Sequence, residues 1–165
     1  MKKIILYILL FFLNITFSFS QNNPDFSFTD VVNNPKAIIK HYKKIESNTI
    51  SDSVKYKLAC ANYSIGFAKK NGREKNLIKA LSIFKLLENS EKYKVNSLFR
   101  QGLCNMGLFQ LDSAYVNFND LLSLNPKIQE AYYFKAFSFY YSKNYSQRTK
   151  KDTLDCFKLI NEMNL

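Results

Sequence analysis

The stretch LFRQGLCNMGLFQLDSAYVNFNDLLSLNP, residues 98–126, decides the fold. The spacing of its apolar residues predicts two amphipathic helices joined in a hairpin. Parts of the stretch recur at a distance of 34 residues on both sides, in the pairs Ala80 and Ala114, Phe84 and Phe118, Leu98 and Tyr132, and Gly102 and Ala136. A period of this length, with a small residue four positions before an aromatic residue, is typical of stacked helical hairpins.

Further helices are expected outside this stretch, because apolar residues continue at steps of three and four. The expected ranges are 35–46, 53–70, 74–87, 90–106, 111–124, 127–142 and 154–163. Asn34-Pro35 marks the first start, since Asn caps free amides and Pro suits the first helical position. Ser90 is expected to cap the fourth helix, and Asn71-Gly72 supplies a residue that tolerates positive φ. The sequence therefore predicts an all-α fold of about three hairpins with an N-terminal capping helix.

Residues 1–20 have the features of a signal peptide. Lys2 and Lys3 precede an apolar run over residues 4–13, and Ser18-Phe19-Ser20 places small residues where a signal peptidase cuts. An uncleaved membrane anchor is the alternative, but the run is shorter than the roughly 18–20 residues that span a bilayer. We expect a mature chain that starts at Gln21, with a flexible arm over 21–34, a helical domain over 35–165 and no transmembrane segment.

Basic residues are concentrated in the first half of the mature chain. Residues 21–100 contain 15 basic and 7 acidic side chains, whereas residues 101–165 contain 7 and 6. This balance favours an acidic partner or an anionic membrane or glycan surface near the N-terminal half, although a solvated Lys-rich surface explains it equally simply. An exported protein is not expected to meet nucleic acid.

The cysteines and the one histidine give little support to an enzyme. Cys60, Cys104 and Cys156 lie in separate segments, either as buried free thiols or with two of them joined in a disulfide. His41 lies on a Lys-rich helix without an acidic or nucleophilic partner at a catalytic spacing. The four glycines are scattered and the His, Cys and carboxylate residues are not clustered. We therefore expect no catalytic residue, no cofactor and no metal.

The repeated pattern resembles the tetratricopeptide repeat. In that family a large residue, Leu-Gly and an aromatic residue occupy the first helix, Ala-x-x-x-Phe the second, and Pro closes the unit. Residues 95–126 agree at Leu98, Gly102, Ala114, Phe118 and Pro126, and depart at Gln101 and Asn105, where Leu and an aromatic residue are usual. The resemblance implies a short right-handed superhelix that binds protein.

The two neighbouring copies are less regular. The later copy has Tyr132, Ala136, Phe139, Thr153 and Phe157, with five inserted residues. The earlier copy has Ile65-Gly66 with Ala80 and Phe84 and two inserted residues, and a register through Leu58-Ala59 would require nine. Such insertions between helices also resemble Sel1-like repeats.

The resemblance further implies a concave groove lined by the first helix of each hairpin. The residues at these positions are Tyr63, Phe67, Phe99, Leu103, Met106, Tyr133, Phe137 and Tyr140. Eight aromatic residues lie between Tyr132 and Tyr145 and surround their helix, so that one core face cannot hide them all. Whether the eight predicted positions form a groove or pack as core stays open at this point.

Three functions fit these features. The first is an exported protein-binding adaptor of the bacterial cell envelope, periplasmic or secreted. The second is an accessory subunit whose exposed aromatic residues form an obligate interface. The third is a basic module that attaches to anionic surfaces through Lys36, Lys40, Lys43, Lys44, Lys69, Lys70, Arg73 and Lys75.

Overall fold

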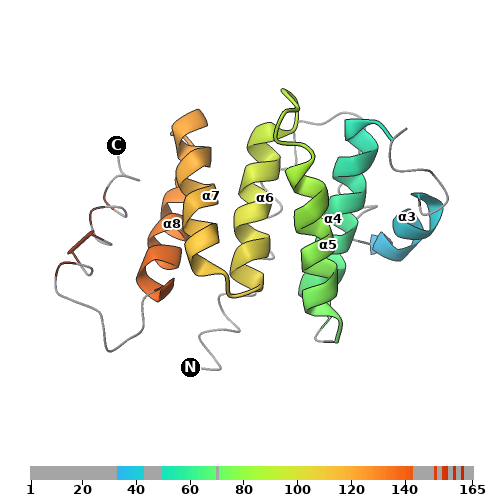
Figure 1. Ribbon diagram of the computed structural model, residues 1–165, viewed down its shortest axis with the longest axis horizontal. Coiled ribbons are helices and arrows are strands. Elements are labelled where there is room, and N and C mark those ends of the chain that lie inside the picture. Colours follow the sequence, from blue (N-terminus) through green and yellow to red (C-terminus); the bar gives the residue numbers. More distant parts are fainter. Residues whose placement is uncertain are drawn as a thin grey trace.

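The computed structural model describes residues 33–42, 50–69 and 71–142, and five single positions at 151, 154, 155, 158 and 161. Within these residues the regular structure is entirely helical. The six helices are α3 (Pro35–Tyr42), α4 (Asp52–Ala68), α5 (Arg73–Lys85), α6 (Lys94–Gly107), α7 (Leu111–Leu124) and α8 (Gln129–Ser142). Figure 1 shows them side by side in chain order, from α3 at one end to α8 at the other.

Contacts between neighbouring helices build a stack of antiparallel hairpins. The pairs α4–α5 and α6–α7 are the two hairpins in the described ranges, and α5–α6 and α7–α8 contacts join them to each other and to α8. Helix α4 also contacts α6, and α3 packs on α4 at the end of the row. The predicted all-α hairpin stack is therefore confirmed, and the expected helix over 154–163 lies mostly outside the described residues.

Local signals act at the starts of α3, α4 and α5. Asn34 Oδ1 accepts a hydrogen bond from the Ala37 amide at 3.3 Å, with Pro35 at the first helical position. Ser51 caps α4, because its Oγ accepts from the Val54 amide at 3.4 Å. Gly72 separates α4 from α5 with φ +82°, a left-handed conformation that glycine adopts without steric cost.

The expected start of α6 at Ser90 is wrong. The helix begins at Lys94, and the Ser90 carbonyl instead accepts hydrogen bonds from the amides of Tyr93 and Lys94. The Ser90 side chain lies near Asp52 at the start of α4. Hydrogen bonds from Lys55, at 3.1 Å, and from Ser90 lower the pKa of the Asp52 carboxyl. Ser90 therefore ties the α5–α6 connection to α4 instead of capping α6.

Glycines in the helices allow large side chains to approach closely. A Cβ atom on Gly102 would lie 2.5 Å from Cζ of Phe118, so the ring of α7 rests directly on the α6 backbone. Leu77 of α5 fills the space beside both Gly66 and Gly107, where an added Cβ would lie 2.7 Å from its methyl carbons. These contacts fix how α5 sits between α4 and α6.

Helices α4 and α5 pack closely along their length. Gly66 on α4 lies opposite Leu77 on α5. The two helices run antiparallel, so the residue seven positions after Leu77 lies opposite the residue seven positions before Gly66. These two residues are Phe84 and Ala59. Ala59 and Phe84 are both fully buried, and the rings of Tyr56 and Phe84 are 5.9 Å apart. Ala59 and Phe84 thus belong to the core between α4 and α5, and Tyr56 packs against it.

Candidate protein-binding surface

The eight residues that the resemblance places in a groove lie on α4, α6 and α8. Their burial differs from helix to helix. Tyr63, Phe99, Leu103 and Met106 are buried, Phe67, Phe137 and Tyr140 are half-buried, and Tyr133 is exposed. The positions on α8 are thus the most accessible, and contact of any of the eight with a partner remains a prediction.

Phe99 holds three helices together. Its ring centroid lies 6.0 Å from that of Phe118 on α7 and 5.9 Å from that of Phe134 on α8. Phe118 and Phe134 also stack on each other at 5.5 Å. All three side chains are almost completely buried. This aromatic cluster positions α8, and it contributes to stability because paired aromatic rings are worth roughly 0.5–1.5 kcal/mol beyond their buried area.

A buried arginine joins α6 to α4, which the sequence pattern did not indicate. Arg100 is only 4% exposed, and its guanidinium lies 4.9 Å from the centre of the Tyr63 ring. Burial by itself lowers the pKa of Arg100, but the hydroxyls of Tyr63 and Tyr56 outweigh this effect and raise it. The same burial raises the pKa of both tyrosines. Arg100 therefore stays charged, and the two tyrosines stay neutral.

Cys60 and Cys104 are free thiols buried near this arginine. Burial raises the pKa of both thiols, and the nearby Arg100 charge offsets only part of that effect. Because the thiolate is the reactive form, both side chains act as small apolar residues. Cys156, the third cysteine, lies outside the described residues.

Three amides form a hydrogen-bonded cluster between α6 and α7. Asn105 Nδ2 donates to Asn117 Oδ1 at 2.6 Å, and Asn117 Nδ2 donates to Gln101 Oε1 at 3.4 Å. Gln101 and Asn105 are buried. These two residues were the departures from the tetratricopeptide pattern. Asn117 on the facing helix bonds to both, whereas Gln101 Nε2 is buried without a hydrogen bond among the described residues.

The surface of α8 carries a row of aromatic side chains on one side of the helix. Tyr133, Phe137, Tyr140 and Tyr141 follow one another at steps that place them on neighbouring turns. Tyr133 is 36% exposed and Tyr141 47% exposed. The rings of Phe137 and Tyr141 are 4.5 Å apart, and those of Tyr140 and Tyr141 are 5.0 Å apart. We call these four residues the α8 aromatic surface.

The buried side of α8 explains why Tyr133 and Tyr141 are exposed, whereas Phe137 packs against the core. Ala131, Phe134 and Ser138 are buried at intervals of three and four residues. Phe134 fills the core position against Phe99 and Phe118. Since a helix of this kind buries one stripe, the remaining aromatic residues must lie at its sides or on its surface.

The described residues contain no group of three His, Cys, Asp or Glu side chains that could hold a metal ion. Among the same residues, none of the helices has both the length and the apolar character needed to cross a bilayer. Comparison of the chain with protein-family models, curated proteins and solved structures found no match.

Proposed function

We propose that this protein is a non-enzymatic binding module with tetratricopeptide-like hairpins that engages a protein or peptide of the bacterial cell envelope. Export by a cleaved signal peptide over residues 1–20 is part of the proposal. The α8 aromatic surface is the observation that carries it. Large aromatic side chains are the residues that most often dominate binding energy at protein interfaces. Here Tyr133 and Tyr141 are exposed on a helix that the core holds through Phe134.

The geometry of the stack supports this role. In the proposed repeat, α4, α6 and α8 are the first helices of their hairpins, and α6 is held between α5 and α7 by close contacts at Gly107 and Gly102. A rigid row of this kind presents side chains of α8 with little entropy lost on binding. Tyrosine is well suited to this position, because its ring buries apolar area while its hydroxyl stays hydrogen-bonded to water or partner.

The experiment compares capture of proteins from envelope extract by the purified protein and by a triple variant, Tyr133→Ala, Phe137→Ala and Tyr140→Ala. Binding is measured in about 0.5 M salt, where charge contacts between exposed groups are screened. A control variant carries Leu86→Ala, Val116→Ala and Leu124→Ala, which removes exposed apolar residues from the C-cap of α5 and from α7 and leaves the α8 aromatic surface intact. Circular dichroism checks that all three proteins are folded.

The proposal expects one protein to be retained by the native chain and the control and lost from the triple variant. Retention by all three folded proteins would contradict an α8 interface. Unfolding of the triple variant would place its residues in the core. If the retained protein is a second copy of the chain, and sedimentation shows self-association lost in the triple variant, the aromatic surface is an obligate interface of the accessory kind.

A second candidate, attachment to an anionic surface, rests on the proximity of Lys36 of α3 and Lys69, which directly follows α4. The nearby Lys36 lowers the pKa of the Lys69 ammonium, because the two positive charges repel each other. Both lysines are exposed, so they form a local positive patch. Binding to vesicles that contain anionic lipid, abolished by salt and weakened by Lys36→Glu with Lys69→Glu, would favour this function over the α8 interface.

A further inference from the structure

The turn between α6 and α7 places an aromatic residue where glycine is usual. The Phe109 amide donates to the Met106 carbonyl at 3.0 Å, and the Gln110 amide donates to the Asn105 carbonyl at 2.8 Å. These two bonds are those of the Schellman motif that ends many helices. In this motif the residue after the helix cap adopts the left-handed conformation, and Phe109 has φ +59°. Among the described residues it is the one non-glycine residue with positive φ.

The conformation of Phe109 is unfavourable, and packing within the chain does not compensate for it. A side chain with a Cβ atom is strained at this φ, and bulky residues are the least tolerated. The Phe109 side chain is 80% exposed, the highest value among the exposed large apolar residues. The ring therefore contributes little to the core and exposes apolar area to water. A backbone outlier of this kind is a reason to look for function.

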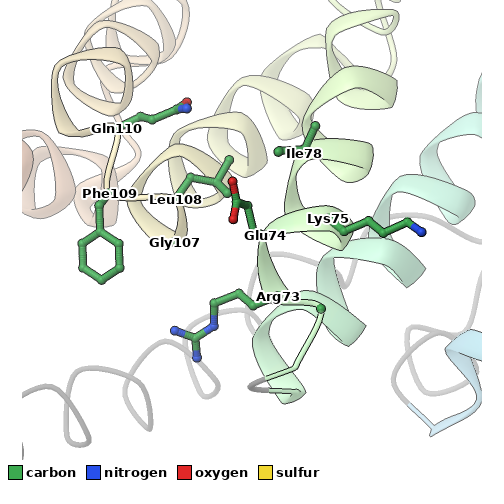
Figure 2. A pocket seen from close by; sticks show the side chains of 9 residues that line it. Arg73, Glu74, Lys75, Ile78, Gly107, Leu108, Phe109 and Gln110 are labelled. Carbon is green, nitrogen blue, oxygen red and sulfur yellow. The ribbon is translucent and has the colours of Figure 1, made fainter.

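Phe109 stands beside a cleft between two turns of the stack (Figure 2). The cleft has a volume of about 510 Å³ and is lined by the start of α5, at residues 72–75 and 78, and by the α6–α7 turn, at residues 107–110. Figure 2 shows Phe109 and the guanidinium of Arg73 extending to the same side, with Glu74 against Leu108 between the two segments. Ile78 of α5, 50% exposed, adds a second apolar side chain.

The charges beside the cleft select the class of partner. Arg73 and Lys75 outnumber Glu74, and the free amides of the first turn of α5 add partial positive charge. The Nε atom of Arg73 is buried and makes no hydrogen bond within the residues that the structure describes. A carboxylate at this place would accept from Arg73, since guanidinium and carboxylate match in geometry. The chain carries a net charge of +11, which disfavours a second copy as the occupant.

We propose that Phe109 and Arg73 form a docking point for an acidic segment of a partner protein, in which a carboxylate stands beside a large apolar side chain. The apolar side chain packs on the Phe109 ring and Ile78, and the carboxylate accepts hydrogen bonds from Arg73. This docking point lies at the α6–α7 turn and is distinct from the α8 aromatic surface. The two sites are tested with different variants, so either can fail alone.

The probe is a phage-displayed library of random peptides, selected on the purified protein at about 0.15 M salt, where charge contacts still act. Synthetic peptides that carry the selected motif, and versions with Asp and Glu replaced by Asn and Gln, are then titrated by fluorescence anisotropy. The variants are Phe109→Gly, Phe109→Asn and Arg73→Gln. Gly and Asn both suit the left-handed conformation, so these two changes remove the ring and keep the turn.

The proposal expects selected peptides that combine an acidic residue with a neighbouring large apolar residue. Affinity should fall about tenfold or more in Phe109→Gly and Phe109→Asn, as for an aromatic anchor. It should fall about two- to fivefold in Arg73→Gln, as for a partly exposed charge pair. Two controls should retain affinity: Lys79→Gln, an exposed charge on α5 outside the cleft lining, and Leu86→Ala, an exposed apolar residue.

The proposal is overturned by any of the following results. Selection yields no peptide, or peptides without acidic residues, or peptides whose amide versions bind equally well. Affinity changes by less than about twofold when Phe109 is replaced in a protein that remains folded. Sedimentation shows that Phe109 instead mediates association of the chain with itself, in which case the occupant is a second copy and the acidic partner is wrong.

Discussion

Replacing Gly102 by alanine tests the packing on which the whole stack depends. The added methyl group would lie 2.5, 2.6 and 2.9 Å from three atoms of the Phe118 ring. Ordinary carbon contacts need roughly 3.5–4.0 Å, so the ring would have to retreat by about 1 Å. It has no room to do so, because it is fully buried and stacks on Phe134 at 5.5 Å.

Two effects of opposite sign determine the magnitude. Alanine in place of a helical glycine stabilises a helix by about 1 kcal/mol. Overpacking costs about 1–3 kcal/mol, and with three overlapping atoms of a pinned ring we expect the upper end of this range. The net loss in the free energy of unfolding is then about 2 kcal/mol, which lowers the Tm by roughly 4–8 °C for a chain of this size.

The assay is thermal and urea unfolding followed by far-UV circular dichroism, on Gly102→Ala, Phe118→Leu and the double variant. Leucine is smaller and more flexible than phenylalanine, so it can move away from the new methyl group. The loss in the double variant should therefore be smaller than the sum of the two single losses by about 1 kcal/mol or more. A Tm that rises in Gly102→Ala, or strict additivity, would refute the contact between Gly102 and Phe118.

Three further predictions follow from the same structure. Phe109→Gly should be at least as stable as the native chain, and more stable than Phe109→Ala by about 1 kcal/mol in urea unfolding, because alanine keeps the left-handed strain. Asn117→Ala should lower the free energy of unfolding by about 2 kcal/mol or more in the same assay, since it leaves two buried amides without a partner. Asn119→Ala, at an exposed position of the same helix, should change this free energy little. Burial raises the pKa of the Cys60 and Cys104 thiols, so their contribution to stability is present below pH 9 and is lost as the pH rises above that value. The Tm should therefore fall from pH 9 to 11. A thiol reagent at neutral pH should label both cysteines only in denaturant.

Local patterns in the sequence determined the helices. Residues 111–124 form α7 as predicted, and Asn34-Pro35 starts α3 as its chemistry requires. Gly72 has the expected positive φ, but it stands at the start of α5, because α4 already ends at Ala68. The hairpin stack could also be predicted from the sequence. A small residue of one helix faces an aromatic ring of the other helix in each hairpin, and this pattern recurs at a fixed spacing along the chain. Ala80 with Phe84 and Ala114 with Phe118 are buried in the two successive hairpins.

The candidate binding surface could be predicted only in part. The excess of aromatic residues in α8 indicated that some must lie outside the core, and Tyr133 and Tyr141 are exposed. The same pattern could not separate them from Phe99 and Tyr63, which are buried. Repeat position gives the face of a helix, but burial at that face depends on which other segments pack against it, and this information is not local.

Tertiary structure decided the features that involve partners far away in the chain. Arg100 is buried because tyrosines of α4 surround it, and Gln101 and Asn105 are accommodated because Asn117 faces them. Ser90 does not cap α6 as expected, because its side chain lies near Asp52 at the start of α4. The left-handed Phe109 violates the local preference for glycine. The sequence by itself thus determined the helices and their order, since backbone hydrogen bonds and apolar periodicity act over a few residues. The burial of polar side chains and the strained backbone conformation were decided by the tertiary structure. The free energy of a buried polar or strained group depends on which other groups the packing brings into contact with it.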